Sequence, residues 1–433
     1  MGSFRLPENM RLGVAAAATQ IEGGDVNNSW YAWFRAGHIK DGSDPSRAAG
    51  HYTLWQEDAA LMKELNVGLY RMGIEWSRIE PEEGQFDTAV LARYRAEIEL
   101  LRSCGVDVLL TLHHFTNPLW FEEKGAFLAP DAQAVFLRFV ERVVTDLGDL
   151  VDDYVTINEP NVYATLGYFY GEWPPGKRSF SEAMRVMRTL AQCHIGAYGL
   201  IHRIRRGMGK NDTRVGFAHH MRVFAPQQKG NPIHRAGASL SSWFFQGAIE
   251  RLFYEGRGAF PAGRPRGVKP GLYCDFHGLN YYTRSTVAGI GDGTRKNAPV
   301  NDLGWEIYPQ GIVECAAHLY KLHKLPIYIT ENGTCDNTDA FRSRYIAEHL
   351  NALVESGLPV ERYYHWCFTD NFEWLEGESA RFGIVHTDYE TLCRTVKESG
   401  RFFAAVIAER GVNGELYERY CNASYRVNRE GEA

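Results

Sequence analysis

Long apolar runs are missing from this chain of 433 residues. No segment approaches the roughly 18 consecutive apolar residues that a membrane-spanning helix needs. The first ten residues, MGSFRLPENM, also lack the basic region and apolar stretch of an export signal. We therefore expect a cytoplasmic protein without a membrane partner.

Clustered basic residues and paired cysteines are missing as well. The formal net charge is −6 and the lysines and arginines are scattered, so we expect no nucleic-acid partner, because phosphate binding needs a concentrated basic surface. The eight cysteines occur singly without a C-x-x-C motif, which favours free thiols over a disulfide framework or a zinc site. No G-x-G-x-x-G or P-loop follows the first apolar run, and we predict no cofactor.

What the chain does contain is a regular alternation of short apolar runs with helical patterns. Eight runs rich in apolar, β-branched or aromatic residues span 12–18, 67–75, 106–114, 153–160, 213–220, 275–282, 325–332 and 362–371. Between them apolar residues recur at helical spacing, as at Leu91, Tyr94, Ile98 and Leu101, and at Phe136, Phe139, Val143 and Leu147.

Such alternation indicates parallel strands, because their connections must cross back and the crossing helices cover both faces of the sheet. With eight units we predict an α/β fold, a closed (β/α)8 TIM barrel, as a single domain over residues 1–433. An open doubly wound sheet is the alternative. The long, glycine-rich loop at 287–305 is predicted to be a wall of a site, because long loops in compact domains are usually functional.

Two glutamates stand at the ends of apolar runs in matching contexts. Glu159 follows YVTIN and precedes Pro160, and Glu331 lies in IYITENG, beside Asn332. Strand ends of a barrel face a common mouth, so the two carboxyl groups would meet there. A protonated carboxyl and an ionised one at such a mouth suit glycoside hydrolysis. The simpler alternative for each glutamate is an ion pair with a neighbouring arginine.

The sequence resembles glycoside hydrolase family 1, the β-glucosidase family, over nearly its whole length. The stretches that carry the resemblance are QIEGG (20–24), YRMGIEWSRIEP (70–81), TINEP, GLNYY (278–282), LGWEIYPQG (303–311), ITENG and WCFTDNFEWLEGESARFGIV (366–385). The resemblance implies a barrel that hydrolyses terminal β-D-glucosyl residues with retention, through a covalent glycosyl-enzyme. It implies a small-molecule β-glycoside as substrate. Fucosides and galactosides are further substrates that we expect.

The resemblance also assigns roles to individual residues. Glu159 matches the acid/base and Glu331 the nucleophile, and retention requires their carboxyl groups to lie about 5 to 5.5 Å apart. Arg71 and Tyr282 match the partners of the nucleophile, and Asn158 the residue that binds the sugar 2-hydroxyl. The remaining matches are substrate-binding residues: Gln20, His114, Glu373 and Trp374 for hydroxyl groups, Trp366 under the ring, Phe382 near position 6 and Trp305 on the aglycone side.

The chain departs from the family pattern at a few positions. Phe115 and Thr116 stand where Trp and Asp are usual, and His113 replaces a common Tyr. We expect the sugar site to survive, because Phe115 keeps an aromatic ring beside His114. Glu378 takes the place of a usual Tyr and is expected to make the site more anionic. With Glu373 and Trp374 retained, a 6-phosphosugar would be repelled.

Other functions stay open at this stage. The histidine pairs at 113–114 and 219–220 admit a metal site, but we predict none, because the first run lacks the H-x-H of metal-dependent barrel hydrolases. A transglycosylase and a non-catalytic sugar-binding barrel are the alternatives to a hydrolase. The sequence leaves open the natural aglycone and the oligomeric state, and a homo-oligomer is possible.

Overall fold

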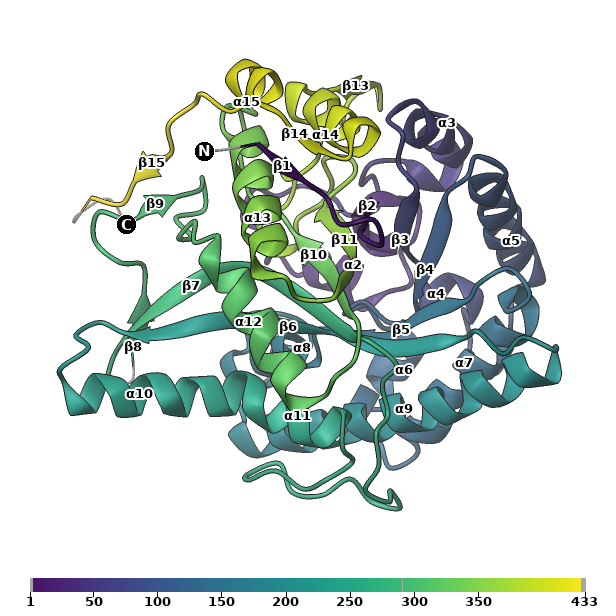
Figure 1. Ribbon diagram of the computed structural model, residues 1–433. Helices are drawn as coiled ribbons and strands as arrows, with labels where there is room; N and C mark the ends of the chain where they lie inside the picture. Colours follow the sequence, from purple (N-terminus) through teal and green to yellow (C-terminus); the bar gives the residue numbers. More distant parts are fainter. Residues whose placement is uncertain (1–2, 290, 430–433) are drawn as a thin grey trace.

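Eight parallel strands form a closed ring in the computed structural model, which describes residues 3–289 and 291–429 (Figure 1). They are β2 (Arg11–Ala15), β3 (Leu69–Gly73), β4 (Asp107–Thr111), β5 (Asp153–Asn158), β6 (Arg214–Pro226), β7 (His277–Ala288), β10 (Ile327–Asn332) and β11 (Val360–Trp366). Each strand pairs with the next, and β11 pairs with β2 to close the ring. The predicted (β/α)8 barrel is confirmed and the open sheet is wrong.

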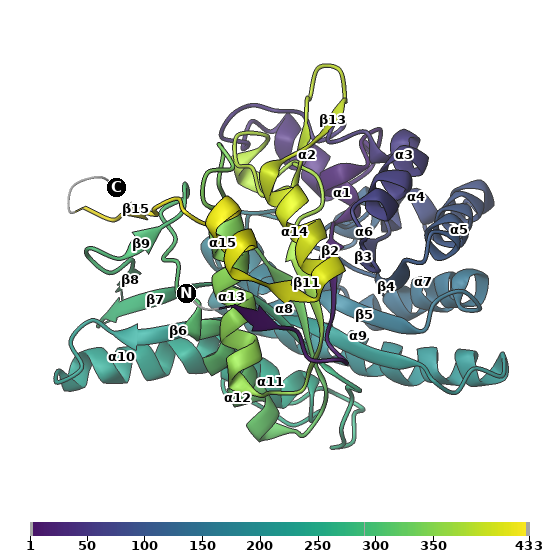
Figure 2. The ribbon, with the colours of Figure 1, turned by 45° about the horizontal axis from the view of Figure 1, so that its top comes forward.

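A helix follows each strand and covers the outside of the ring (Figure 2). The main helices are α3 (His51–Glu64), α5 (Thr88–Ser103), α7 (Ala132–Leu147), α9 (Phe180–Gly207), α11 (Ala248–Phe253), α12 (Gln310–Leu322), α13 (Arg342–Ser356) and α14 (Glu398–Glu409). The residues that predicted α5 and α7 by their spacing are all buried, so each helix turns this face toward the barrel.

Shorter elements decorate the ends of the barrel. The short helices are α1 (Ala18–Ile21), α2 (Ser29–Arg35), α4 (Trp76–Ile79), α6 (Leu119–Glu123), α8 (Pro160–Ala164), α10 (Pro232–Ser242) and α15 (Gly414–Tyr420). The short strands are β1 (Phe4–Arg5), β8 (Gly291–Gly293), β9 (Pro299–Val300), β12 (Val385–Thr387), β13 (Arg394–Val396), β14 (Gly411–Val412) and β15 (Arg426–Val427). β1 pairs with β14, so the first described residues lie beside the segment that follows α14.

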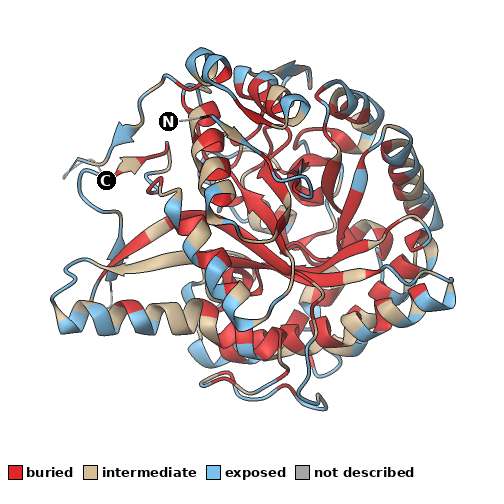
Figure 3. Cartoon of the chain, in the orientation of Figure 1, coloured by how far each residue is buried: buried red, intermediate tan, exposed pale blue. Residues whose placement is uncertain are grey.

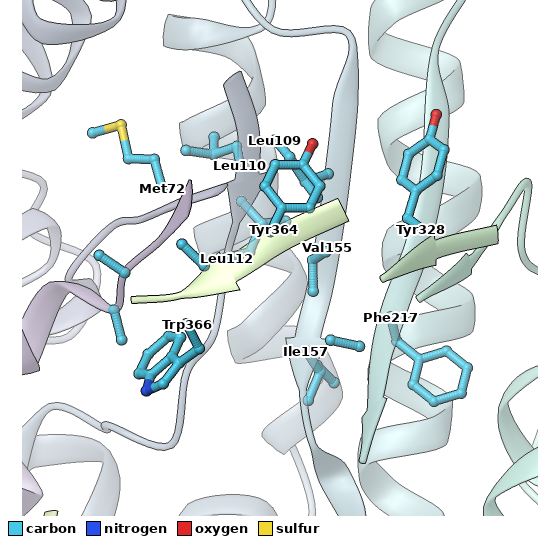
Figure 4. Packing of buried hydrophobic residues seen from close by; sticks show 14 of the residues in the cluster. Met72, Leu109, Leu110, Leu112, Val155, Ile157, Phe217, Tyr328, Tyr364 and Trp366 are labelled. Atoms are coloured by element: carbon cyan, nitrogen blue, oxygen red, sulfur yellow. The ribbon is translucent and has the colours of Figure 1, made fainter. Parts of the chain in front are cut away.

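The core lies in and around the ring. Every residue of β3, β5 and β10 is buried, as expected for parallel strands that are covered on both faces (Figure 3). Figure 4 shows side chains from neighbouring strands packed together, among them Met72 of β3, Val155 of β5 and Tyr364 of β11. This packed ring is a rigid base for the residues that follow each strand.

The structure differs from the sequence prediction mainly at strand ends. The last barrel strand ends at Trp366, before the predicted 371, and the first ends at Ala15. β6 and β7 instead continue several residues beyond their predicted ends and remain paired, and β8 adds to the edge of this extension. The predicted loop 287–305 contains β8 and β9. Ile290 of that loop, and residues 1–2 and 430–433 of the predicted domain, lie outside the described residues.

Two predictions from composition can be compared with the structure. Each of the eight cysteines is a free thiol, which confirms the prediction from their spacing. Within residues 3–289 and 291–429, no helix combines the length and the apolar character needed to cross a bilayer.

Candidate active site

A cavity of about 310 Å³ lies at the carboxyl ends of the barrel strands. Active sites of (β/α)8 barrels occupy this end. Nine predicted site residues line the cavity: His114, Glu159, Tyr282, Trp305, Glu331, Trp366, Glu373, Trp374 and Phe382. Gln20, Arg71 and Asn158 are fully buried and do not line it. The three form a supporting layer.

The turn after β5 brings Glu159 to the cavity. Glu159 has a left-handed backbone with φ of 41°, which costs an L-residue about 1 kcal/mol. Its backbone N–H donates to the Ala218 carbonyl of β6 at 2.8 Å. Pro160 then begins α8, where its fixed φ suits the first helical position. The chain thus leaves the strand abruptly and holds the Glu159 side chain at the rim.

One oxygen of the Glu159 carboxyl group is held by two neighbours that the sequence analysis did not assign. Its Oε1 accepts from Asn280 Nδ2 at 2.8 Å and contacts His220 Nδ1 at 2.9 Å. Its Oε2 forms no hydrogen bond within the described residues. Asn280 lies inside the GLNYY stretch and His220 ends the fifth apolar run, which were the available signals. Oε2 is the oxygen left for a substrate.

Glu331 is held by a cation and a phenol. Arg71, from β3, forms a buried ion pair with Glu331 Oε1, and the Tyr282 hydroxyl donates to Oε2 at 2.5 Å. Arg71 is fully buried, so little solvent screens this pair. Both partners favour the ionised carboxylate, as an attacking anion requires.

Two amides connect the carboxyl groups. Asn158 Oδ1 accepts from Arg71 Nη2 at 2.6 Å and from Asn280 Nδ2 at 3.1 Å. This fixes the orientation of the Asn158 amide, whose Nδ2 lies 2.9 Å from His114 Nε2. Burial lowers the pKa of His114 well below its ordinary value, and Arg71 adds to this, so the ring is neutral and Nε2 accepts. The network runs unbroken from Glu159 to Glu331.

Burial acts on both carboxyl groups, and their neighbours distinguish them. Burial raises the pKa of Glu331 to about 7 against the effect of Arg71, and the charge of Glu159 adds to the rise. Burial also acts to raise the pKa of Glu159, but His220 and Asn280 lower it below its ordinary value. Part of that lowering requires a positive charge on His220, whereas the charge of Arg71 beside Glu331 is permanent.

The contacts of His220 argue against a positive imidazole in the resting site. Its Nε2 is buried and has no hydrogen-bond partner in the described part of the chain, so a proton there would be an unsatisfied buried donor. A neutral ring with its proton on Nδ1 donates to Glu159 without that cost. With His220 neutral, we assign the negative charge to Glu331 and the proton of the pair to Glu159.

The inner end of the cavity is closed by aromatic rings. Trp374 packs against Trp30, Trp173 and Phe115, with ring centroids 4.7, 5.8 and 5.3 Å away. His114 lies between Trp366 and Trp374, 5.8 Å from each.

The polar group at this end is Glu373. Its pKa is raised to about 8 by burial and by Glu331, so Glu373 is a neutral hydrogen-bonding group near pH 7. Gln20 lies behind it and donates to its Oε2 at 3.2 Å.

The positions that depart from the family pattern have different outcomes. Phe115 lines the cavity with its ring 4.9 Å from that of His114, as predicted. Thr116 is buried, with its hydroxyl 2.5 Å from that of Thr19. Glu378 does not line the cavity, and its backbone N–H donates to Asp41 at 2.8 Å. Glu378 was expected to make the site more anionic, but it has no contact with the cavity that would support this expectation.

The histidine pairs face different surroundings. His113 contacts Asn117 at 2.9 Å among aromatic rings, and His219 is buried with neither ring nitrogen paired. Across the described residues, no cluster of three or more His, Cys, Asp or Glu side chains could hold a metal ion.

Comparison with known proteins agrees with this geometry. The model of the family "Glycosyl hydrolase family 1" matches residues 3–269 and 272–412. The chain is 31% identical to a β-glucosidase of an Agrobacterium species, over 93% of this chain and 95% of the relative. It is 28% identical to a β-galactosidase of Pyrococcus woesei, over 95% and 99%.

A solved structure is similar over the same extent. The β-glycosidase from Pyrococcus horikoshii superimposes with a TM-score of 0.88 at 32% identity and covers 96% of this chain and 98% of its own. The family model, these relatives and the shared barrel lead to one conclusion. The chain belongs to glycosyl hydrolase family 1 and is a glycoside hydrolase.

Proposed function

We propose that the chain is a retaining, exo-acting β-glycosidase that acts first on β-D-glucosides, and also on β-fucosides and β-galactosides. One observation carries the proposal: Glu159 and Glu331 line one cavity, and their surroundings favour a proton on the first and a charge on the second. This is the division of roles that double displacement needs.

In the first step, Glu331 attacks the anomeric carbon while Glu159 Oε2 gives its proton to the leaving oxygen. This forms a glycosyl ester on Glu331 and releases the aglycone. Loss of the Glu331 charge lowers the proton affinity of Glu159, and because Glu159 is now ionised it can take a proton from water. The water attacks the anomeric carbon and Glu331 leaves. Each step inverts the configuration of the anomeric carbon, so the product retains the configuration of the substrate.

The proposed sugar preference follows from the inner end of the cavity. Because aromatic rings close this end, the cavity can hold only the end of a sugar chain, which favours exo action on terminal residues. Glu373 supplies a hydrogen-bonding group for hydroxyls, while Phe382 adds an apolar surface near position 6. Phe382 offers a 6-phosphate no cationic partner, so we expect neutral sugars to be preferred. The names of the Agrobacterium and Pyrococcus relatives support glucosides and galactosides.

The first test is Glu331→Gln, assayed with 4-nitrophenyl β-D-glucoside. Removing the nucleophile should lower kcat by at least about a thousandfold, because no other described carboxylate has the same contacts with Arg71 and Tyr282. Near-unchanged turnover would refute the assignment. Glu378→Gln is a matched control outside the cavity and should keep the activity of the parent.

The second test is Glu159→Ala with added azide. Substrates with good leaving groups should react best in this variant, because their departure needs no proton. Azide should restore the rate by capturing the glycosyl-enzyme as a β-glycosyl azide. A variant that shows no response to azide would contradict the acid/base role.

A third experiment addresses specificity and outcome. We propose a panel of nitrophenyl glucoside, galactoside, fucoside and 6-phosphoglucoside together with cellobiose, with product configuration followed by NMR. Retained β-anomers and slow cleavage of the phosphosugar are expected. Dominant oligosaccharide formation would favour the transglycosylase, and binding without cleavage would favour the sugar-binding barrel.

A further inference from the structure

The outer half of the cavity is built on an extension of two strands. Beyond the barrel, β6 and β7 stay paired from Val223↔Arg284 to Pro226↔Val287, and both reach away from the ring toward α10 and β8 (Figure 1). The register shifts between Met221 and Val223, so Arg222 lies opposite the irregularity at Tyr282 and Thr283. Such irregularities often redirect side chains beside active sites.

Arg222 lines this outer half as a cation without a matching carboxylate. Its Nη1 donates to the Ser285 hydroxyl at 3.3 Å, and its guanidinium lies 4.9 Å from the Phe245 ring centre. Its Nε is buried and has no hydrogen-bond partner among the described residues. No described carboxylate forms an ion pair with Arg222.

Arg284 lines the same cavity but, unlike Arg222, has a carboxylate partner. It pairs with Glu306 and stacks on the Tyr308 ring at 3.7 Å. Asp292 also lines the mouth, but it is exposed and forms no ion pair with Arg222. Arg222 is therefore the lining cation with donor capacity left over.

A partly buried cation without a counter-ion is unfavourable by itself. Burial lowers the pKa of Arg222, opposed by Asp292 and Glu159. An anion bound within the cavity would remove this penalty, and a guanidinium binds a carboxylate through two parallel hydrogen bonds. The neighbours suit an aromatic body: Val162, Leu166 and Trp305 are apolar, and Ser285 and Thr294 offer hydroxyl groups.

We propose that Arg222 binds an acidic group on the leaving part of the substrate, so that this enzyme prefers β-glycosides of aromatic hydroxy acids. The inference rests on the proposed function, since it names the aglycone of the same site. The carboxylate lies at the extension of β6 and β7, and the glycosidic oxygen lies at Glu159.

The test compares 4-carboxyphenyl and 4-carbamoylphenyl β-D-glucosides, which share shape and sugar but differ in charge. Wild-type kcat/KM should be on the order of tenfold higher for the carboxylate, as expected for a charge-assisted contact. In Arg222→Gln the ratio should fall close to one. In Arg235→Gln, the same change on exposed α10 outside the cavity, the ratio should stay as in the wild type.

The outcomes separate the two proposals. A wild-type ratio near one, or a ratio that Arg222→Gln leaves intact, overturns the aglycone assignment. If these glucosides and 4-nitrophenyl β-D-glucoside all remain uncleaved, the proposed function fails and the aglycone assignment fails with it. Inhibition of the wild-type enzyme by free 4-hydroxybenzoate and 4-hydroxybenzamide gives the same comparison without a variant, and stronger inhibition by the acid is expected.

Discussion

The charge of Glu331 depends in part on the Tyr282 hydroxyl, which donates a hydrogen bond to it. Its hydrogen bond lowers the pKa of Glu331, which burial raises to about 7. In the proposed mechanism Glu331 attacks as an anion, so activity should fall as pH drops through the pKa of Glu331. In Tyr282→Phe the pKa rises further, and the acid limb of kcat/KM should move to higher pH. A pH profile with 4-nitrophenyl β-D-glucoside measures this, and an unmoved limb would contradict it.

His220 is predicted to act through Glu159. His220→Leu removes one of the two donors at Glu159 Oε1, so kcat/KM for glucosides of poor leaving groups should fall about tenfold, as for a lost hydrogen bond. Dinitrophenyl glucoside, which leaves without a proton, should lose less than threefold. His220→Asn can supply an N–H and should recover part of the loss. Equal losses on both substrates would instead indicate a structural role.

Individual residues were predictable from the sequence only where a motif names them. Eight of the nine predicted residues that line the cavity lie in the quoted stretches, and His114 is the exception. The stretches did not indicate that Gln20 lies behind Glu373, nor that Asn280 and His220 hold Glu159. The two contacts of Glu159 depend on the register His220↔Asn280 between β6 and β7, and apolar patterns do not specify register.

At the scale of elements, β10 and β11 meet without room for a side chain at Gly333. A Cβ there would lie 1.9 Å from the Trp366 carbonyl oxygen and 3.2 Å from the Trp366 Cβ. Gly333→Ala should therefore displace Trp366, lower stability by about 1 to 3 kcal/mol and raise KM for glucosides.

Thermal unfolding and steady-state kinetics measure both effects of Gly333→Ala. Gly199→Ala is the matched control, because a Cβ at this position of α9 meets nothing within 4 Å. It should be neutral or slightly stabilising. Equal melting temperatures for the two variants would show that the strands adapt to the extra atom.

The order of the elements followed from the sequence, whereas their ends did not. Eight apolar runs became eight barrel strands because burial on both faces requires near-continuous apolar sequence. The extension of β6 and β7 was missed because RVFAP begins with Arg and ends with Pro, and TRSTVA consists largely of polar residues, so neither continues the apolar run of its strand. A pattern that distinguishes strand from helix does not tell where a strand leaves its sheet.

For the whole molecule, a buried charged cluster joins the first part of the barrel to the last. His51 contacts Asp58 and Glu97 at 2.7 Å each, and Arg394 pairs with Asp58 at 2.9 Å. Burial acts to lower the pKa of His51, but Glu97 and Asp58 raise it to about 9. The cluster thus holds α3, α5 and β13 together while the imidazole is positive.

This cluster makes a prediction about pH and stability. Because the folded pKa exceeds the ordinary 6.5, His51 contributes stability fully below about pH 6.5 and loses it as pH rises through about 9. His51→Gln should be less stable than the wild type by a few kcal/mol at pH 6, and this difference should narrow by pH 9.5. Urea unfolding at both pH values measures it. A difference that is constant with pH would show that His51 carries no proton in the fold.

The proposed aglycone side of the cavity lies partly on β6, β7 and β8, and this has a practical consequence. Glu159 and Glu331, the proposed catalytic residues, lie at the ends of barrel strands, whereas this part of the aglycone side lies on the extension of β6 and β7. Replacing this extension with the corresponding segment of a relative should alter the choice of leaving group without changing the residues proposed for cleavage. The proposed recognition of the leaving group and the proposed cleavage chemistry thus lie on different parts of the fold.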